Sequence, residues 1–135
     1  MDFIKTIKKA MERELLEEST KLKYDKKYIT NTKIIGYFRW LDLDKSGKPE
    51  FVGITKLNLK YNDLKNNLKE VRENGHEKFS LTQEVKSITD MTAYLEKEIN
   101  SNIHLSVPLY FNMVAILQYI KEFENEAKSF LFPTA

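Results

Sequence analysis

The chain has no cysteine. Disulfides and thiolate metal sites are therefore excluded, and the folded state must depend on packing alone. This absence suits a reducing compartment, so we expect a cytoplasmic protein. We also expect no signal peptide, because residues 1–5 lead straight into a charged amphipathic pattern without a continuous apolar segment.

Glycine and proline are scarce, with four and three residues among 135. No run rich in Pro, Gly or Ser divides the chain, so we predict a single domain over residues 1–135. Four glycines are too few for the usual phosphate-binding loops, and no serine lies in a glycine-flanked nucleophile motif. Nucleotide-dependent enzymes are disfavoured, and no cofactor is expected.

The residues that are present favour a globular protein, since 41% are hydrophobic and 31% are charged. The formal net charge of +2 is unevenly divided. Residues 1–69 carry 16 basic and 10 acidic side chains, whereas residues 70–135 carry 6 and 10. Such a split either directs the N-terminal half toward an anionic partner or lets the two halves complement each other.

The segment from Ile34 to Leu57 predicts a β-hairpin. Two runs of aromatic and β-branched residues, 34–41 and 51–55, flank a loop of Asp, Ser, Gly and Pro. The aromatic residues of the two strands cannot all point to one face, so we expect the sheet to expose a binding surface. Its candidate residues are Tyr37, Arg39, Trp40 and Phe51.

Helical periodicity predicts a first helix over residues 2–23, capped by Asp2. Its lysines lie toward the positive end of the helix dipole, the reverse of the stabilising order. Packing must therefore hold this helix, or another molecule must use these charges. The lysines concerned are Lys5, Lys8 and Lys9.

The later elements complete a predicted α+β domain, in which two C-terminal helices cover a small antiparallel sheet. We expect a helix over 58–74, a third strand over 78–86, a helix over 87–100 and a last helix from Pro108 to Phe130. Between Val107 and Ile120 this last helix is almost entirely apolar, but it is shorter than the roughly 20 residues that cross a membrane. It is therefore buried within the chain or forms an interface, including one between copies of the chain, and no membrane partner is expected.

A basic segment before the hairpin is the alternative binding surface. It interleaves lysines with tyrosines, a composition that contacts phosphates and stacks on bases. Its other interpretation is an exposed connection with half-buried tyrosines. The segment's candidate residues are Lys21, Lys23, Tyr24, Lys26 and Lys27.

The sequence contains no convincing motif for metal binding or for acid–base catalysis. The hairpin loop matches a calcium loop at Asp42, Asp44 and Ser46, but Gly53 occupies the place of the bidentate glutamate. Neither histidine, His76 or His104, has a metal-ligand companion at helical or loop spacing. We predict no metal site and no catalytic residue.

Several short motifs resemble those of GIY-YIG endonucleases. They are Gly36-Tyr37-Phe38, Phe51-Val52-Gly53, Ala93-Tyr94-Leu95-Glu96 and Pro108-Leu109-Tyr110-Phe111-Asn112. The resemblance implies a metal-binding role for Glu96 and a site role for Asn112. Phe38 and Phe51 replace the tyrosines of that family, so the resemblance implies a nuclease that is catalytically dead or nearly so.

The region from Leu64 to Ser87 resembles small YezG-like immunity proteins of bacterial toxin systems. A leucine-spaced helix there ends in Asn74-Gly75 and leads into the strand at Phe79. This resemblance implies an inhibitor that binds a toxin. We therefore predict a non-catalytic cytoplasmic binding protein of the immunity, inhibitor or phage-accessory kind, with a nucleic-acid-binding protein as the alternative.

Overall fold

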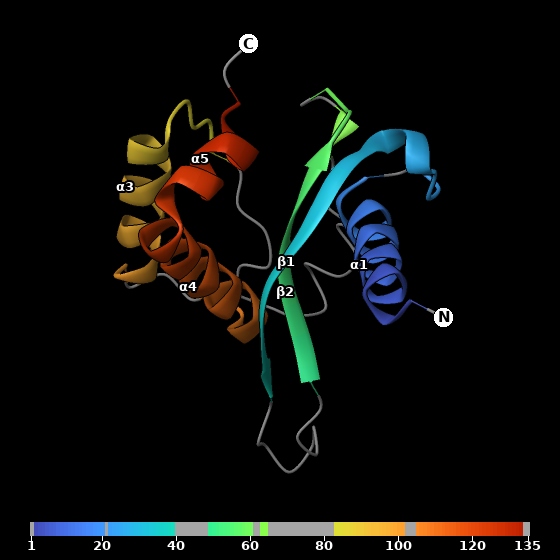
Figure 1. Cartoon of the computed structure of the whole chain (residues 1–135), viewed down its shortest axis with the longest axis horizontal. Coiled ribbons are helices and arrows are strands. Elements are labelled where there is room, and N and C mark those ends of the chain that lie inside the picture. The colour runs from blue at the N-terminus through green and yellow to red at the C-terminus, as the bar shows by residue number, and fades with distance from the viewer. Residues whose placement is uncertain are drawn as a thin grey trace. The chain divides into compact units, whose positions relative to one another are not determined.

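A computed structural model shows an α+β fold, which confirms the predicted class. Within the described residues it contains four α-helices, a short 3-10 helix and a two-stranded antiparallel sheet (Figure 1). The structure describes residues 2–20, 22–39, 49–60, 63–64, 83–101 and 105–133.

The chain divides into two compact units. Unit 1 comprises Met1–Ile34 and Ile54–His76, and unit 2 comprises Ile35–Gly53 and Glu77–Ala135. Each strand of the hairpin therefore contributes residues to both units. One domain over residues 1–135 stays a prediction.

Helix α1 (Phe3–Ser19) begins at the predicted cap. A side-chain oxygen of Asp2 accepts hydrogen bonds from the backbone N–H groups of Ile4, at 3.0 Å, and Lys5, at 3.3 Å. The predicted end at residue 23 is wrong, because Thr20 has extended backbone angles and ends the helix. The Thr20 hydroxyl donates to the carbonyl of Leu16 and accepts from the N–H of Leu22, which satisfies backbone groups at the helix end.

The interior of unit 1 combines an apolar and a polar side chain of α1. Leu16 has no exposed surface, and Glu12 is also buried. The Glu12 carboxylate accepts a hydrogen bond from the hydroxyl of Thr32, at 3.1 Å, and this hydroxyl lies 3.0 Å from that of Thr55. Hydrogen bonds of this kind offset the cost of burying a charged group.

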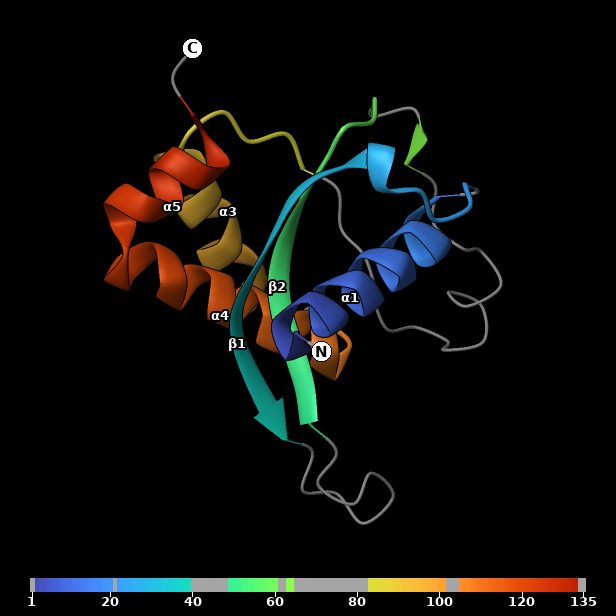
Figure 2. The same cartoon turned by 45° about the vertical axis from the view of Figure 1, so that its right-hand side comes forward.

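The predicted hairpin is formed by β1 (Ile29–Arg39) and β2 (Pro49–Leu57), which run side by side in Figures 1 and 2. Both strands start earlier than predicted. Pro49 begins β2 instead of lying in the loop, and the first position of a strand tolerates a missing N–H. A 3-10 helix, η1 (Lys26–Tyr28), precedes β1, and the N–H of Asn58 donates to the carbonyl of Tyr28 at 2.8 Å.

Unit 2 contains three helices that pack on one another: α3 (Ile88–Ile99), α4 (Val107–Glu122) and α5 (Glu124–Leu131). Serine side chains cap the first two. The Ser87 hydroxyl accepts from the N–H of Asp90, at 3.1 Å, and the Ser106 hydroxyl accepts from that of Leu109, at 3.2 Å. The buried side chains at the helix contacts are Leu95, Met113, Ile120 and Ala127.

The prediction of one continuous last helix is wrong, because the backbone leaves the helical region at Phe123. This residue has φ −131° and ψ 51°, and α5 begins directly after it. Glu124 and Glu126 thereby occupy the first turn of a new helix, where negative charge interacts favourably with the helix dipole. In one continuous helix they would lie in its C-terminal half, where the dipole disfavours them.

Two further predicted elements lie mostly outside the described residues. Of the helix over 58–74, the described residues 58–60 and 63–64 are not α-helical. Of the strand over 78–86, the described residues 83–86 are not in a strand. Across the described part of the chain, no helix has the length and apolar character needed to cross a membrane.

In α3, Tyr94 lies one helical turn before Glu98, which has a buried carboxylate oxygen. Burial, and secondly the negative charge of Glu98, raise the pKa of Tyr94 above its ordinary value of 10.0. The Oε2 atom of Glu98 is buried and has no hydrogen-bond partner among the described residues. The unfolded chain therefore loses the Tyr94 proton at a lower pH than the native chain does.

Replacing Glu98 by glutamine is expected to lower the pKa of Tyr94 only in part, because its burial remains. The tyrosinate absorbance of each protein is followed against pH, and the Tyr94→Phe variant identifies which transition belongs to Tyr94. Since the native pKa is raised, Tyr94 lowers stability as the pH rises past the unfolded value of 10.0. An unchanged Tyr94 transition in the glutamine variant would show that Glu98 has no influence on it.

Candidate protein-binding groove

An apolar groove of about 450 Å³ lies in unit 2, between the hairpin and helix α4. Its lining is mainly aromatic and aliphatic, which is the usual character of a site that binds apolar groups. The lining residues are Ile35, Gly36, Tyr37, Phe38, Val52, Phe111, Val114, Ala115, Gln118, Tyr119, Glu122 and Phe123.

Stacked aromatic rings join the two walls of the groove. The rings of Phe38 in β1 and Phe111 in α4 stack with their centroids 4.7 Å apart and an interplanar angle of 22°. Tyr110 meets the same Phe111 ring edge to face, at 5.6 Å. Aromatic pairs in these geometries contribute about 0.5–1.5 kcal/mol beyond their buried area.

Other aromatic side chains of the groove are exposed. Tyr37 is 67% exposed and Phe123 is 53% exposed. Successive side chains of a strand point to opposite faces, so Phe38 turns toward α4 while Tyr37 turns outward, where its ring lies 6.2 Å from that of Phe51. The hairpin therefore exposes aromatic surface, as predicted, and α4 adds Phe111, which is 41% exposed.

Glycine keeps the strand side of the groove open. A Cβ atom at Gly36 would lie 3.2 Å from Cγ2 of Val52, closer than ordinary van der Waals contact. A larger residue there would push against Val52 and occupy space in the groove.

The groove is acidic at one end. Glu122 is the charged residue among its lining side chains, and its Oε1 accepts a hydrogen bond from the side chain of Gln118 at 3.1 Å. Glu124 follows two positions later in the chain, but it lines a different hollow of unit 2. A ligand with apolar groups and a positive charge would complement this end of the groove.

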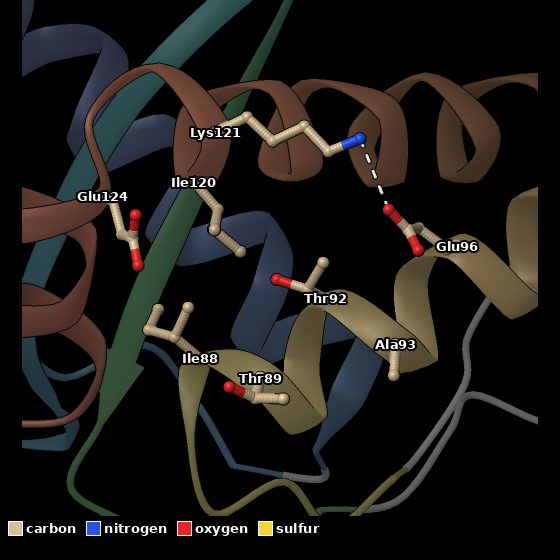
Figure 3. A pocket seen from close by; sticks show the side chains of 8 residues that line it. All are labelled: Ile88, Thr89, Thr92, Ala93, Glu96, Ile120, Lys121 and Glu124. Atoms are coloured by element: carbon tan, nitrogen blue, oxygen red, sulfur yellow. Dashed lines mark ion pairs between the residues drawn. The ribbon is translucent and has the colours of Figure 1, made fainter.

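A second hollow, of about 420 Å³, lies among the three helices of unit 2 (Figure 3). Ile88, Ala93 and Ile120 contribute its apolar side chains. Lys121 reaches across its rim to Glu96, with Nζ and Oε1 3.3 Å apart. This ion pair is exposed, and such pairs contribute about 0–1 kcal/mol.

The two residues implied by the nuclease resemblance have other interactions in the structure. Glu96 pairs with Lys121, and the amide of Asn112 donates to the backbone carbonyl of Pro108 at 2.9 Å. Within the described residues, no three His, Asp or Glu side chains are grouped as metal ligands. Asp42, Asp44 and Ser46, which partly match a calcium loop, and both histidines lie outside the described residues.

The predicted binding residues fall into two places. Tyr37, Arg39 and Phe51 are exposed on the part of the hairpin that belongs to unit 2, and Trp40 lies outside the described residues. The sequence did not single out Phe111 of α4 or Phe123, which follows α4, as site residues, although the apolar run from Val107 was a signal for an interface.

The basic segment belongs to unit 1. Lys23, Lys26 and Lys27 are exposed, Tyr24 is half-buried, and Lys21 lies outside the described residues. The ammonium of Lys27 lies 5.1 Å from the centre of the Tyr28 ring, in cation–π geometry. That face of the ring is therefore already occupied.

Comparison of the chain with protein-family models, curated proteins and solved structures finds no match in any of the three. The resemblances to GIY-YIG endonucleases and to YezG-like immunity proteins stay predictions. Function must accordingly be inferred from the groove and its chemistry.

Proposed function

We propose that the protein is a non-catalytic binding protein that acts by contact with another protein through the groove of unit 2. The observation that carries this proposal is the exposure of Tyr37, Phe111 and Phe123 around an apolar groove. Aromatic residues are enriched at protein interfaces and supply most of the energetic anchors there. An immunity, inhibitor or phage-accessory role in the cytoplasm is the setting that we propose for this contact.

The exposed aromatic side chains of the groove would contribute part of the binding energy. Burying a large apolar side chain contributes about 1.5–3 kcal/mol. Tyr37 and Phe123 keep more than half of their surface exposed, so a partner that covers both gains a few kcal/mol from them. The carboxylate of Glu122 adds orientation, because a misplaced partner would leave it desolvated and without a counter-charge.

Photocrosslinking can identify the partner and test the groove together. Benzoylphenylalanine at position 37 is expected to crosslink a partner protein in the cells that make this chain. The same group in place of Lys97, which is exposed, is the control and should crosslink less often. The captured protein is then purified and titrated with the Tyr37→Ser, Phe123→Ser and Lys97→Ser variants. Each aromatic variant should bind at least about tenfold more weakly, corresponding to about 1.4 kcal/mol, and the lysine variant should bind normally.

Two results would contradict the proposed function. Crosslinks at position 37 that are no more frequent than at position 97 would remove the evidence for a partner at the groove. Equal affinity of all variants for the captured protein would place the contact elsewhere.

Nucleic acid binding through Lys23, Lys26 and Lys27 is tested in parallel. Phosphate contacts release counterions, so such binding must weaken steeply as salt rises. A gel-shift series at two salt concentrations measures this, and the absence of a shift at low salt would exclude it. The Lys27–Tyr28 contact disfavours this alternative, because base stacking there would have to displace the ammonium.

A further inference from the structure

The hollow of about 420 Å³ among α3, α4 and α5 has both an apolar and a polar part. Ile88, Ala93 and Ile120 form the apolar part, and Ile120 is only 3% exposed. The volume lies toward the lower end of the range of about 300–1,000 Å³ that is typical of ligand sites. The hollow therefore has room for a small molecule that carries an apolar group.

Two side chains with oxygen atoms line the same hollow. Thr92 is half-buried and Glu124 is exposed, and in Figure 3 the side chains of Ile88 and Ile120 lie between them. A threonine within a helix often donates to the carbonyl four residues before it. Within the described part of the chain, however, neither the Thr92 hydroxyl nor the Glu124 carboxylate forms a hydrogen bond or an ion pair. Both can therefore accept a hydrogen bond from another molecule.

The charges around the hollow are unequal. Its lining has the carboxylates of Glu96 and Glu124 and the ammonium of Lys121. This ammonium is paired with Glu96, at 3.3 Å. Negative charge thus remains at Glu124, so the hollow favours a cation over an anion.

From these observations we infer that the hollow binds a small aliphatic amine in its ammonium form. The ammonium donates hydrogen bonds to the Glu124 carboxylate and the Thr92 hydroxyl, and the alkyl chain packs on Ile88 and Ile120. An ammonium group has three donors and no acceptor, which suits oxygen atoms that have no donor of their own. This inference goes beyond the proposed function, because the hollow is separate from the groove and its ligand is a small molecule.

Chemical-shift titration of the isotope-labelled full chain with n-pentylamine at neutral pH tests the inference. The signals of Ile88, Thr92 and Ile120 should shift and should approach saturation. The matched probe is 1-pentanol, which has the same alkyl chain but no charge. It should bind at least about threefold more weakly, because a hydrogen bond to a charged group is stronger than one between neutral groups.

A lysine side chain of another protein carries the same ammonium, so a second probe distinguishes the two sources. Nα-acetyl-lysine methylamide presents this group on a peptide backbone, and it should bind more weakly than n-pentylamine. Tighter binding of the lysine derivative would overturn the assignment of the hollow to a small molecule.

Variants of the two oxygen-bearing side chains locate the ammonium. Glu124→Gln keeps the size of the side chain but removes its charge, and it should weaken the binding of n-pentylamine by about threefold or more. Thr92→Val should weaken it by about twofold or more, whereas Thr92→Ser keeps the hydroxyl and should bind as the wild type does. Glu17→Gln makes the same charge change at an exposed position of α1 and should have no effect.

Lys121→Met is expected to act in the opposite direction. It removes the positive charge from the hollow and leaves the Glu96 carboxylate without its lysine partner. The variant should therefore bind n-pentylamine about twofold more tightly or better, since exposed ion pairs contribute about 0–1 kcal/mol. A variant that merely disturbed the packing of the helices would weaken binding instead.

The inference is overturned if n-pentylamine shifts none of the signals of the hollow, or if 1-pentanol binds as tightly. It is also overturned if Glu124→Gln and Thr92→Val both bind normally, or if Lys121→Met binds more weakly than the wild type. The crosslinking test uses a residue of the groove and an external protein. Failure of amine binding and failure of the proposed function are therefore distinguishable.

Discussion

Replacing Leu16 by alanine is expected to lower the free energy of unfolding by about 2–5 kcal/mol. Leu16 has no exposed surface in the folded chain. Its truncation removes buried apolar contacts of α1 and leaves a cavity that the surrounding side chains fill only in part. Urea unfolding followed by circular dichroism measures the loss for the variant against the wild type.

Ile4→Ala is the matched control for this prediction. It removes the same number of carbon atoms from the same helix, but Ile4 is 51% exposed. Its effect should stay within about 0.5 kcal/mol, as for most surface substitutions. If the two variants lose equal stability at low protein concentration, then α1 is not held by the burial of Leu16.

The second large effect is expected from Thr32→Val, at about 1–3 kcal/mol. Valine has nearly the shape of threonine, but it lacks the hydroxyl that donates to Glu12 and lies within hydrogen-bond distance of the Thr55 hydroxyl. The buried carboxylate of Glu12 thereby loses a donor while it remains out of water. Chemical denaturation measures the loss, and Thr30→Val at an exposed position of the same strand is the control.

A double-mutant cycle measures the coupling energy between Glu12 and Thr32. Glu12→Leu combined with Thr32→Val should cost clearly less than the sum of the single changes, because an apolar pair leaves no buried charge without a partner. Strictly additive losses would show that the two side chains are not coupled in solution.

Local signals in the sequence predicted the starts of helices well. Asp2 caps α1 and Ser87 caps α3, and a side-chain oxygen reaches N–H groups only two or three residues away. The hairpin was predicted for the same reason, since its strand formers and its loop are adjacent in the chain. The end of α1 was missed because the apolar spacing continues to Leu22, whereas the hydroxyl of Thr20 ends the helix.

The interior of unit 1 was not predictable from such signals. Glu12 belongs to a run of charged residues in which no local signal marks it for burial, and its buried partner Thr32 lies 20 positions away. The early start of β1 was also not predictable from local signals. Residues 29–33 lack the aromatic pattern of residues 34–39, and they form a strand because they pair with β2.

In the candidate site, too, some features were predictable from the sequence and others depended on the tertiary structure. Alternation along the strands was enough to predict that the hairpin exposes aromatic side chains, and composition was enough to exclude disulfides. Only the tertiary structure decided that Phe111 and Phe123 join them around one groove with Glu122 at its end. Caps, turns and alternation depend on atoms a few residues apart, so the sequence alone determines them. The groove instead depends on packing between distant segments, such as Phe38 and Phe111, which lie 73 positions apart.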